Sequence, residues 1–344
     1  MPDVTPPAAD ERLELLGRWL ATRLPGRALR LAPASADASF RRYFRVWDGA
    51  RTWVAMDAPP ATEDVRPFVR VGRALLAAGL RVPEIAECDE AEGFLLLSDL
   101  GDTHFLAALR AGATPQSLYP GAAAVLCRMQ SSATLTDGLD AYDPPFIARE
   151  VSLFPTWFLG RHLGAEPDRP VLALLERVLE VLNGAFAAQP QVFVHRDYHS
   201  RNLMVAADGE PGILDFQDAI VGPVTYDLVS LYKDCYVRWP RSTVLEWVED
   251  YRCRGIAAGL KLPGQGEFVR WFDLVGLQRH LKVLGIFARL WYRDGKPAYL
   301  ADLPLVLDYV RETTALYGEL SELEAFISAV VLPRFAPAQA RAGA

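Results

Sequence analysis

The sequence predicts an α+β fold in which a small β-rich lobe precedes a large, mainly helical lobe. Strand patterns and helix patterns are grouped along the chain rather than alternating, which is typical of this fold class. A short polar turn at residues 98–101 separates the two groups. With 344 residues, of which 51% are hydrophobic, the chain can bury a large core. We therefore expect two coupled lobes, residues 1–97 and 98–344, with the hinge at residues 98–101.

The first lobe opens with a helix and continues with strands. Leucines at helical spacing in residues 11–24 predict an amphipathic helix. "RALRLAP" favours a strand, and "FRRYFRVWDGARTWVAMDA" predicts two strands that turn at Asp48 and Gly49. A second helix ends near Gly79, a suitable C-cap, and "FLLLSDLGD" then predicts a short buried strand.

The second lobe is mainly helical from about Thr103, with one strand-rich interruption at residues 192–216. There "QVFVHRD" predicts a strand that leads into a loop, and "NLMV" and "GILDF" predict two short strands joined by an Asp-Gly turn. A hairpin of this length returns Asn202 and Asp215 to the same end. Asp197 then lies across from them on the loop.

Composition excludes several classes of function. Lys and Arg number 36 against 43 Asp and Glu, and this net charge of −7 does not favour a general nucleic-acid binder. The N-terminus lacks the basic and apolar regions of a signal peptide, and no apolar run has the length of a membrane-spanning helix. The four cysteines are widely spaced, without a metal-ligand pattern. We expect a cytoplasmic protein with reduced thiols and no membrane, nucleic-acid or obligate protein partner.

Asp197, Asn202 and Asp215 together suit phosphoryl transfer. That reaction requires neutralised phosphates and an aligned attacking oxygen more than covalent chemistry. Mg²⁺ prefers hard oxygen ligands, which Asn202 and Asp215 supply, and the Asp197 carboxylate can orient and deprotonate a hydroxyl. An isolated Asp more often satisfies hydrogen bonds in a buried turn, but these residues together resemble the catalytic loop and the metal-binding Asp-Phe pair of a known kinase signature. The sequence therefore predicts ATP and Mg²⁺ as cofactors, with Asp197 as the catalytic residue.

"VHRDYHSRN" and "ILDFQDA" resemble the catalytic loop and the metal-binding strand of the kinase fold. His199 narrows the resemblance, because the run Asp-x-His-x-x-Asn is similar to that of the aminoglycoside phosphotransferase-like small-molecule kinases. The segment between Asp215 and Asp227 is also too short to hold a peptide substrate. The resemblance implies a two-lobed protein-kinase-like fold with ATP between the lobes. The adenine would then lie against "LLLSDLG", which contains Leu97 and Asp99.

The resemblance extends over roughly residues 35–300. "SADASFRRYFRV", "DFQDAIVGPVTYDLVSL" and "GLQRHLKVLGIFARLWYRDGK" are similar to stretches of the bacterial anomeric kinases of N-acetylmuramate and N-acetylglucosamine. This implies a sugar kinase that phosphorylates the anomeric hydroxyl of these amino sugars in peptidoglycan recycling, with the sugar and ATP as its partners. Kinases of an aminoglycoside, choline or homoserine remain alternatives, as does a non-catalytic nucleotide-binding protein.

The sequence departs from the kinase pattern at one ion pair. "VAMD" places Asp57 where the third strand usually carries Lys, and residues 65–80 contain no acid to serve as its partner in the following helix. Because the lysine and its acidic partner are absent together, neither charge is left buried without a counter-charge. Another cation should then face the phosphates, assisted by backbone N–H groups. The candidates for this cation are Arg41, Arg42 and Arg45, although an exposed strand face also commonly carries arginines. Ser39 could hydrogen-bond the phosphate oxygens.

Two further groups complete the predicted site. The expected substrate contacts are His199, Arg279, His280 and Lys282. Arg279 and Lys282 could approach the lactyl carboxylate of N-acetylmuramate, or could instead extend from a helix surface into solvent. The imidazoles could bind sugar hydroxyls. His195 and Asp227 are expected to brace the catalytic loop, Asp227 as the N-cap of an apolar helix.

Overall fold

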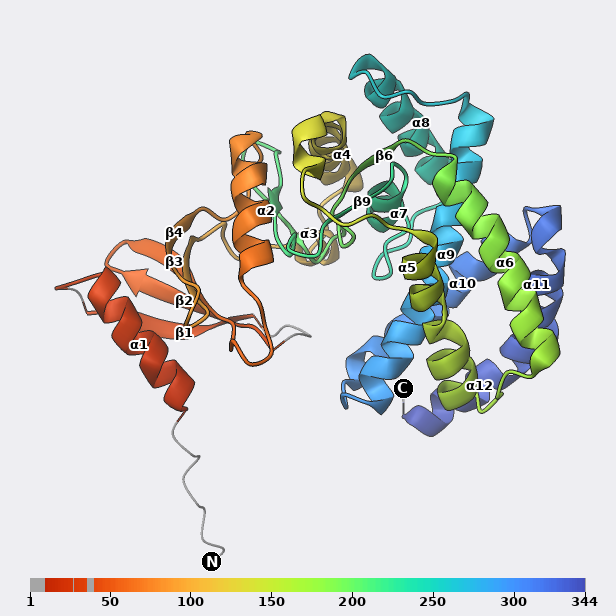
Figure 1. Ribbon diagram of the computed structural model, residues 1–344, viewed down its shortest axis with the longest axis horizontal. Coiled ribbons are helices and arrows are strands. Elements are labelled where there is room, and N and C mark those ends of the chain that lie inside the picture. Colours follow the sequence, from red (N-terminus) through yellow and green to blue (C-terminus); the bar gives the residue numbers. More distant parts are fainter. Residues whose placement is uncertain (1–9, 27, 36–39, 344) are drawn as a thin grey trace, which may run out of the picture. The chain divides into compact units, whose positions relative to one another are not determined.

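A computed structural model describes residues 10–26, 28–35 and 40–343. The chain divides into two compact units, shown in Figure 1. The first comprises the chain up to Asp102 together with Gly212–Asp218, and the second comprises Thr103–Pro211 and the chain from Ala219 onward. The division expected from sequence ended the first lobe at residue 97 and assigned residues 212–218 to the second. These residues join the first unit because Phe216 packs against Phe68 there, with ring centroids 4.7 Å apart.

The first unit is built on an antiparallel five-stranded sheet of order β1-β2-β3-β5-β4. Its strands are β1 (Arg30–Ser35), β2 (Arg42–Asp48), β3 (Arg51–Asp57), β4 (Ile85–Asp89) and β5 (Phe94–Ser98). β2 and β3 form the expected hairpin, in which Asp48 pairs with Arg51 and Gly49 takes a φ of 60° that suits glycine. Helix α1 (Glu11–Arg23) buries Leu16 and Leu20 in the core of this unit. Helix α2 (Arg66–Ala77) carries Phe68 and Gly72 toward Phe216.

The second unit is mainly helical. Its helices are α3 (Phe105–Arg110), α4 (Pro115–Ser131), α5 (Pro144–Val151), α6 (Arg169–Ala187), α7 (Tyr226–Tyr232), α8 (Arg241–Ala257), α9 (Gln265–Tyr292), α10 (Leu303–Thr314), α11 (Ser321–Phe326) and α12 (Leu332–Ala342). Segments of 3-10 helix are η1 (Ala133–Thr136), η3 (Pro297–Asp302) and η4 (Gly318–Leu320), and segments of π-helix are η2 (Phe154–His162) and η5 (Ile327–Val331). Strand β6 (Gln191–Val194) pairs antiparallel with β9 (Ile220–Pro223). The short strand β7 (Leu203–Met204) follows the catalytic loop, while β8 (Gly212–Ile213) belongs to the first unit.

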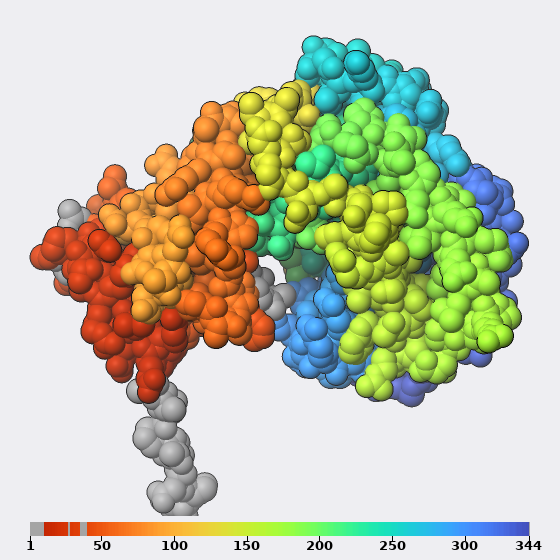
Figure 2. Space-filling model, in the orientation of Figure 1, coloured from red at the N-terminus to blue at the C-terminus, as the bar shows by residue number. Residues whose placement is uncertain are grey.

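The long helix α9 forms the centre of the second unit. It packs against α5, α6, α7, α8, α10 and η2. Figure 2 shows side chains of α6 on the visible face of this unit. Because helices surround α9, polar residues on it are buried rather than exposed to solvent. The α+β prediction with a β-rich first part and a helical second part is confirmed.

Two other sequence expectations concern the whole chain. None of the helices that the structure describes combines the length and the apolar character that crossing a membrane requires. The four cysteines, Cys88, Cys127, Cys235 and Cys253, are free thiols.

Close packing of α9 on η2 gives a stability prediction. A Cβ at Gly285 would overlap the backbone of Leu153, which cannot easily move, whereas a Cβ at Gly276 would meet Val229 at an ordinary 3.5 Å. Gly285→Ala should therefore destabilise the protein by roughly 1–3 kcal/mol. Gly276→Ala, the matched control, should be neutral or slightly stabilising because alanine favours the helix. Thermal unfolding of both variants checks this, and equal melting temperatures would contradict it.

Candidate active site

The predicted catalytic loop follows β6 and is fixed by a carboxylate from α7. The backbone N–H groups of His195 and Arg196 donate to Asp227, at 2.6 and 2.9 Å. Arg196 has a φ of 76°, which is uncommon for a residue other than glycine. Burial raises the pKa of Asp227 to about 7, although the two amide hydrogen bonds act to lower it. This contact lies immediately before Asp197 and has the geometry expected of the brace. The expected N-cap role of Asp227 is wrong, because Thr225 is the N-cap of α7 and Asp227 lies in its first turn.

Asp197 lies among cations at the end of this loop. Its side chain is 40% exposed, and its Oδ1 is 3.9 Å from both His199 Nε2 and Arg279 Nη2. Burial alone would raise the pKa of Asp197, but Lys282 and then His199 and Arg279 lower it to about 2. The carboxylate is therefore ionised throughout the physiological pH range and can accept a hydrogen bond from a hydroxyl group.

The two predicted metal ligands belong to different units. Asn202 donates from Nδ2 to the backbone oxygen of Asp197, at 3.0 Å, and its backbone N–H donates to the oxygen of His199. The Asp, His and Asn of the motif are thus tied together within one loop. Asp215 lies in the first unit with a φ of 63°, and its Oδ1 accepts a hydrogen bond from Gln217 at 2.5 Å.

Beside Asp197, the second unit presents an imidazole, the aromatic ring of a tyrosine and two guanidinium groups. His199 packs edge-on against Tyr236, with ring centroids 5.4 Å apart, and burial lowers the pKa of His199. The guanidinium of Arg201 lies 3.6 Å from the centroid of the same tyrosine. Arg279 donates to Cys235 Sγ at 3.3 Å. Polar and aromatic groups side by side are suited to binding a sugar, which has both hydroxyl groups and apolar C–H faces.

Lys282 is buried and paired with a residue that the sequence analysis missed. Glu150 on α5 accepts from Lys282 Nζ at 2.7 Å and from Arg196 Nη2 at 2.7 Å. Gln278 Nε2 adds a third contact at 3.1 Å, and the hydroxyl of Tyr142 a fourth. Lys282 therefore does not extend into solvent. Glu150 is a lone acid in a short helix, and no sequence pattern distinguishes it from an exposed one.

His280 is not part of this group. Its ring is buried, stacks on Tyr309 with centroids 4.7 Å apart, and forms a hydrogen bond through Nε2 with the oxygen of Lys233 at 3.1 Å. Both partners come from the packing of α9 against α7 and α10. The expected contact between His280 and a sugar hydroxyl is thus not supported, because the helix turns this side chain into the core.

Glu150 should contribute strongly to stability. Glu150→Gln leaves the Lys282 and Arg196 charges buried without their counter-charge, which should cost about 3–5 kcal/mol at pH 7. Burial alone would raise the pKa of Glu150, but Lys282 and Arg196 lower it from 4.5 to about 2. The stabilisation is therefore present above pH 4.5 and is lost as the pH falls toward 2.

Urea unfolding at pH 7 and at pH 3 measures this effect. The gap between the wild type and Glu150→Gln should narrow at the lower pH, where the wild-type carboxylate begins to take up its proton. Glu176 is exposed on α6, so Glu176→Gln serves as the matched control and should have wild-type stability. A Glu150→Gln protein as stable as the wild type at pH 7 would show that the cluster contributes nothing.

In the first unit, three predicted arginines have different partners. Arg42 donates to Asp57 from Nε and Nη2, at 3.0 and 2.5 Å, and also pairs with Asp10. Arg45 pairs with Asp99 at 2.8 Å and donates to the oxygen of Gly101. The remaining predicted residues and contacts of this unit are Arg41 with Glu63 at 3.0 Å, Leu97 buried in β5, and Ser39, which lies outside the described residues.

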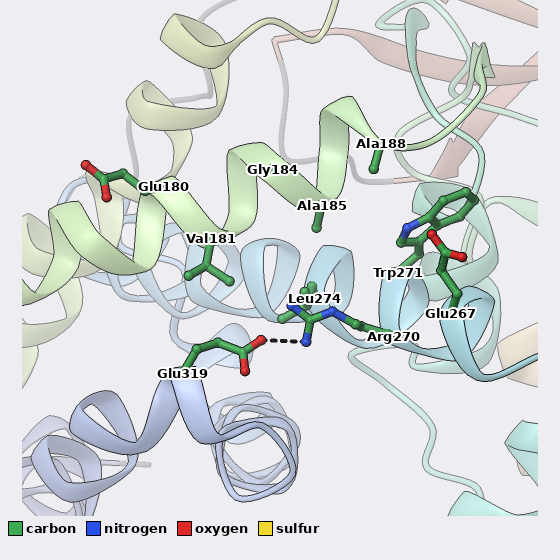
Figure 3. A pocket seen from close by; sticks show the side chains of 10 residues that line it. All are labelled: Glu180, Val181, Gly184, Ala185, Ala188, Glu267, Arg270, Trp271, Leu274 and Glu319. Atoms are coloured by element: carbon green, nitrogen blue, oxygen red, sulfur yellow. Dashed lines mark ion pairs between the residues drawn. The ribbon is translucent and has the colours of Figure 1, made fainter. Parts of the chain in front are cut away.

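A pocket elsewhere in the second unit contains none of the predicted site residues. Its volume is about 680 Å³, and it lies among α6, α9 and η4. As Figure 3 shows, Val181, Ala185 and Leu274 form its apolar part, and an ion pair between Arg270 and Glu319 lies beside them. The pocket holds no group with a role in phosphoryl transfer, so the candidate active site remains the loop around Asp197.

Comparison with known proteins assigns the chain to a family. Residues 30–261 match the model of the phosphotransferase enzyme family. The chain belongs to that family. This phosphotransferase also has the fold of solved relatives at low sequence identity. An ADP-bound aminoglycoside phosphotransferase APH(2'')-Ib is 12% identical, with a TM-score of 0.57 over 87% of this chain and 98% of that one. The choline kinase LicA from Streptococcus pneumoniae is 10% identical, with a TM-score of 0.62 over 87% and 99%. The protein-kinase-like fold expected from the resemblance is therefore confirmed.

Curated relatives of this phosphotransferase are far more similar in sequence. A Pseudomonas aeruginosa protein named N-acetylmuramate/N-acetylglucosamine kinase is 46% identical over 325 residues, which cover 91% of this chain and 95% of that protein. A Neisseria meningitidis protein of the same name is 43% identical over 322 residues, covering 92% and 95%. The family predicted from the motifs is confirmed.

Proposed function

We propose that this phosphotransferase transfers the γ-phosphoryl group of ATP to the anomeric hydroxyl of N-acetylmuramate and N-acetylglucosamine. The main support is the identity of 43–46% over more than nine-tenths of the chain to proteins named for these two sugars. The products would be sugar 1-phosphates, which serve nucleotide-sugar synthesis when peptidoglycan is recycled. Such a role belongs in the cytoplasm, where ATP is available.

Asp197 would act on the sugar hydroxyl. Its ionised carboxylate accepts the hydrogen bond of the hydroxyl and directs an oxygen lone pair at the γ-phosphorus. As the new P–O bond forms, the bond from the γ-phosphorus to the bridging oxygen breaks, ADP leaves, and the hydroxyl proton passes to Asp197. A carboxylate with a pKa of about 2 is a weak base, so its main contribution is orientation, with proton transfer late in the step. An anomeric hydroxyl suits such a base because it is more acidic than an ordinary alcohol.

Asn202 and Asp215 would hold Mg²⁺. Their donor set of one amide oxygen and one carboxylate matches the preference of this ion for a few hard protein ligands, with phosphate and water completing its shell. The hydrogen bond from Asn202 Nδ2 to the Asp197 backbone fixes the orientation of the amide, and Oδ1 is the atom of this amide that could serve as a ligand to a cation. Bound there, Mg²⁺ supplies positive charge that neutralises the phosphates.

His199 and Arg279 would bind the sugar. Both lie within 3.9 Å of the Asp197 carboxylate, so a hydroxyl held by Asp197 comes within reach of them. An imidazole can donate a hydrogen bond to a hydroxyl group, and its neutral form can also accept one. Arg279 is the predicted contact for the lactyl carboxylate that distinguishes N-acetylmuramate, whereas the charge of Lys282 is already matched by Glu150.

A panel of acceptors tests the assignment. The purified protein is incubated with ATP and Mg²⁺ and with N-acetylmuramate, N-acetylglucosamine, kanamycin or choline, and ADP release is followed. The two amino sugars should be turned over, and kanamycin and choline should leave the rate at that of the buffer control. Turnover of kanamycin or choline in place of the sugars would refute the assignment of the substrate.

A further inference from the structure

Where kinases usually carry a lysine on the third strand, this chain has Asp57, a carboxylate whose charge is balanced by two arginines. Asp57 ends β3 and is fully buried. Its two oxygens accept hydrogen bonds from Arg12 Nε at 3.1 Å and from Arg42 Nε at 3.0 Å. Arg42 stands opposite Asp57 in the register of β2 and β3. This ion-pair group joins α1 to the sheet, and its charges are satisfied internally, so it supplies no cation for a phosphate.

Arg41 is oriented differently from its neighbour Arg42. Successive side chains of an extended chain point to opposite sides, which separates Arg41 from the Asp57 group. Its Nε lies 3.0 Å from Glu63 Oε2, and the side chains of Arg41 and Glu63 are only 10% and 12% exposed. The carboxylates of Glu63, Asp215 and Asp218 all act on this guanidinium. Asp215, the candidate metal ligand, is thus one of the charged groups that act on Arg41.

Packing of α2 connects Glu63 with Asp215. Glu63 lies just before α2, and its Oε1 accepts from the backbone N–H of Phe40 at 3.2 Å. Phe216, next to Asp215, packs on Phe68 of α2, and a Cβ at Gly72 would lie 3.1 Å from its ring. The start of α2, Arg41 and Asp215 therefore belong to one packed body within the first unit.

We propose that Arg41 and Glu63 replace the usual kinase pair of a third-strand lysine and a helix glutamate. Arg41 binds the phosphate oxygens of ATP, and Glu63 is the positioning residue that holds its guanidinium. The cation of the pair is the residue before β2 instead of a residue of β3. The acid lies in the segment before α2 instead of within the helix. Arginine suits this role because its planar guanidinium can meet one anion while still donating to another. The inference rests on the proposed use of ATP and identifies the residues that bind its phosphates.

Nucleotide binding without any sugar is the sharpest test. Calorimetric affinities are measured for Mg·ADP and for adenosine, which shares the base and ribose but has no phosphates. Arg41→Ala should weaken Mg·ADP binding about 10- to 100-fold, the range for a charge-assisted hydrogen bond, and leave adenosine binding unchanged. Arg41→Lys should recover part of the loss. Adding Glu63→Ala to Arg41→Ala should cause little further loss, because both changes disrupt one interaction.

The chain offers a matched control in the same segment. Arg66 and Asp64 form an exposed ion pair at the start of α2, with distances near 2.8 Å. Arg66→Ala and Asp64→Asn should both bind Mg·ADP as the wild type does. Wild-type Mg·ADP affinity in Arg41→Ala would overturn the inference, as would equal losses of ADP and adenosine affinity, which indicate a structural role. Arg41-dependent ADP binding in a protein that phosphorylates no sugar would refute the proposed function and leave this inference standing.

Discussion

Asp197→Asn should lower kcat with N-acetylmuramate by about 100- to 10,000-fold, the range for loss of a positioned general base. The amide keeps the shape of the side chain, but it carries no charge and cannot take the hydroxyl proton. The affinity for ATP should remain at the wild-type value, since the assigned contacts of the nucleotide lie elsewhere. Steady-state kinetics and calorimetric ATP binding on the same preparation separate the two effects.

The pKa of Asp197 adds a second expectation. Because Lys282, His199 and Arg279 outweigh burial and lower this pKa to about 2, the carboxylate stays ionised down to that pH. The activity of the wild type should therefore show no acid limb from this residue between pH 5 and 9, and the deficit of Asp197→Asn should be constant over that range. Asp208→Asn is a suitable control, because Asp208 is exposed on the turn after β7. A rate near that of the wild type for Asp197→Asn would remove Asp197 as the base.

Asp215→Asn and Asn202→Ala should each lower kcat at least about 100-fold at ordinary Mg²⁺ concentrations. Each variant removes one of the two protein oxygens assigned to the ion. Turnover should also require more free Mg²⁺, and chelation of Mg²⁺ should abolish the activity of the wild type. Rates are measured as a function of free Mg²⁺ for each variant, with Asp208→Asn as the control. An unchanged Mg²⁺ requirement in both variants would place the metal on other residues.

Local patterns were sufficient to predict the main elements and the loop that brings Asp197, His199 and Asn202 together. The hairpin at Asp48 and Gly49 follows from turn chemistry and alternation, both of which act over a few residues. Asp197, His199 and Asn202 are close in sequence, so the loop that unites them is also local. The position of residues 212–218 was predicted less well, because it depends on the packing of Phe216 on α2, a contact between segments distant in sequence.

Residues paired over long range could not be recognised from the sequence. Glu150 and Lys282 are on different helices, and neither position differs in pattern from an exposed charge. Glu63 lies before residues 65–80, the helical segment in which a kinase would carry its acid, so the kinase pattern does not point to this residue. His280 is adjacent to Arg279 in sequence, but neighbours in sequence point to different sides of a helix, and the His280 ring packs on Tyr309. In each case the burial and the partner, rather than the residue type, decide the role.

The position of the new phosphate ester tests the central proposal most directly. N-acetylmuramate is incubated with the protein, ATP and Mg²⁺, and the product is examined by phosphorus NMR together with an assay for the reducing end. We expect a sugar 1-phosphate, identified by coupling of phosphorus to the anomeric proton and by loss of reducing activity. A phosphate on another hydroxyl, with the reducing end intact, or no transfer at all, would contradict the assignment of this protein as an anomeric sugar kinase.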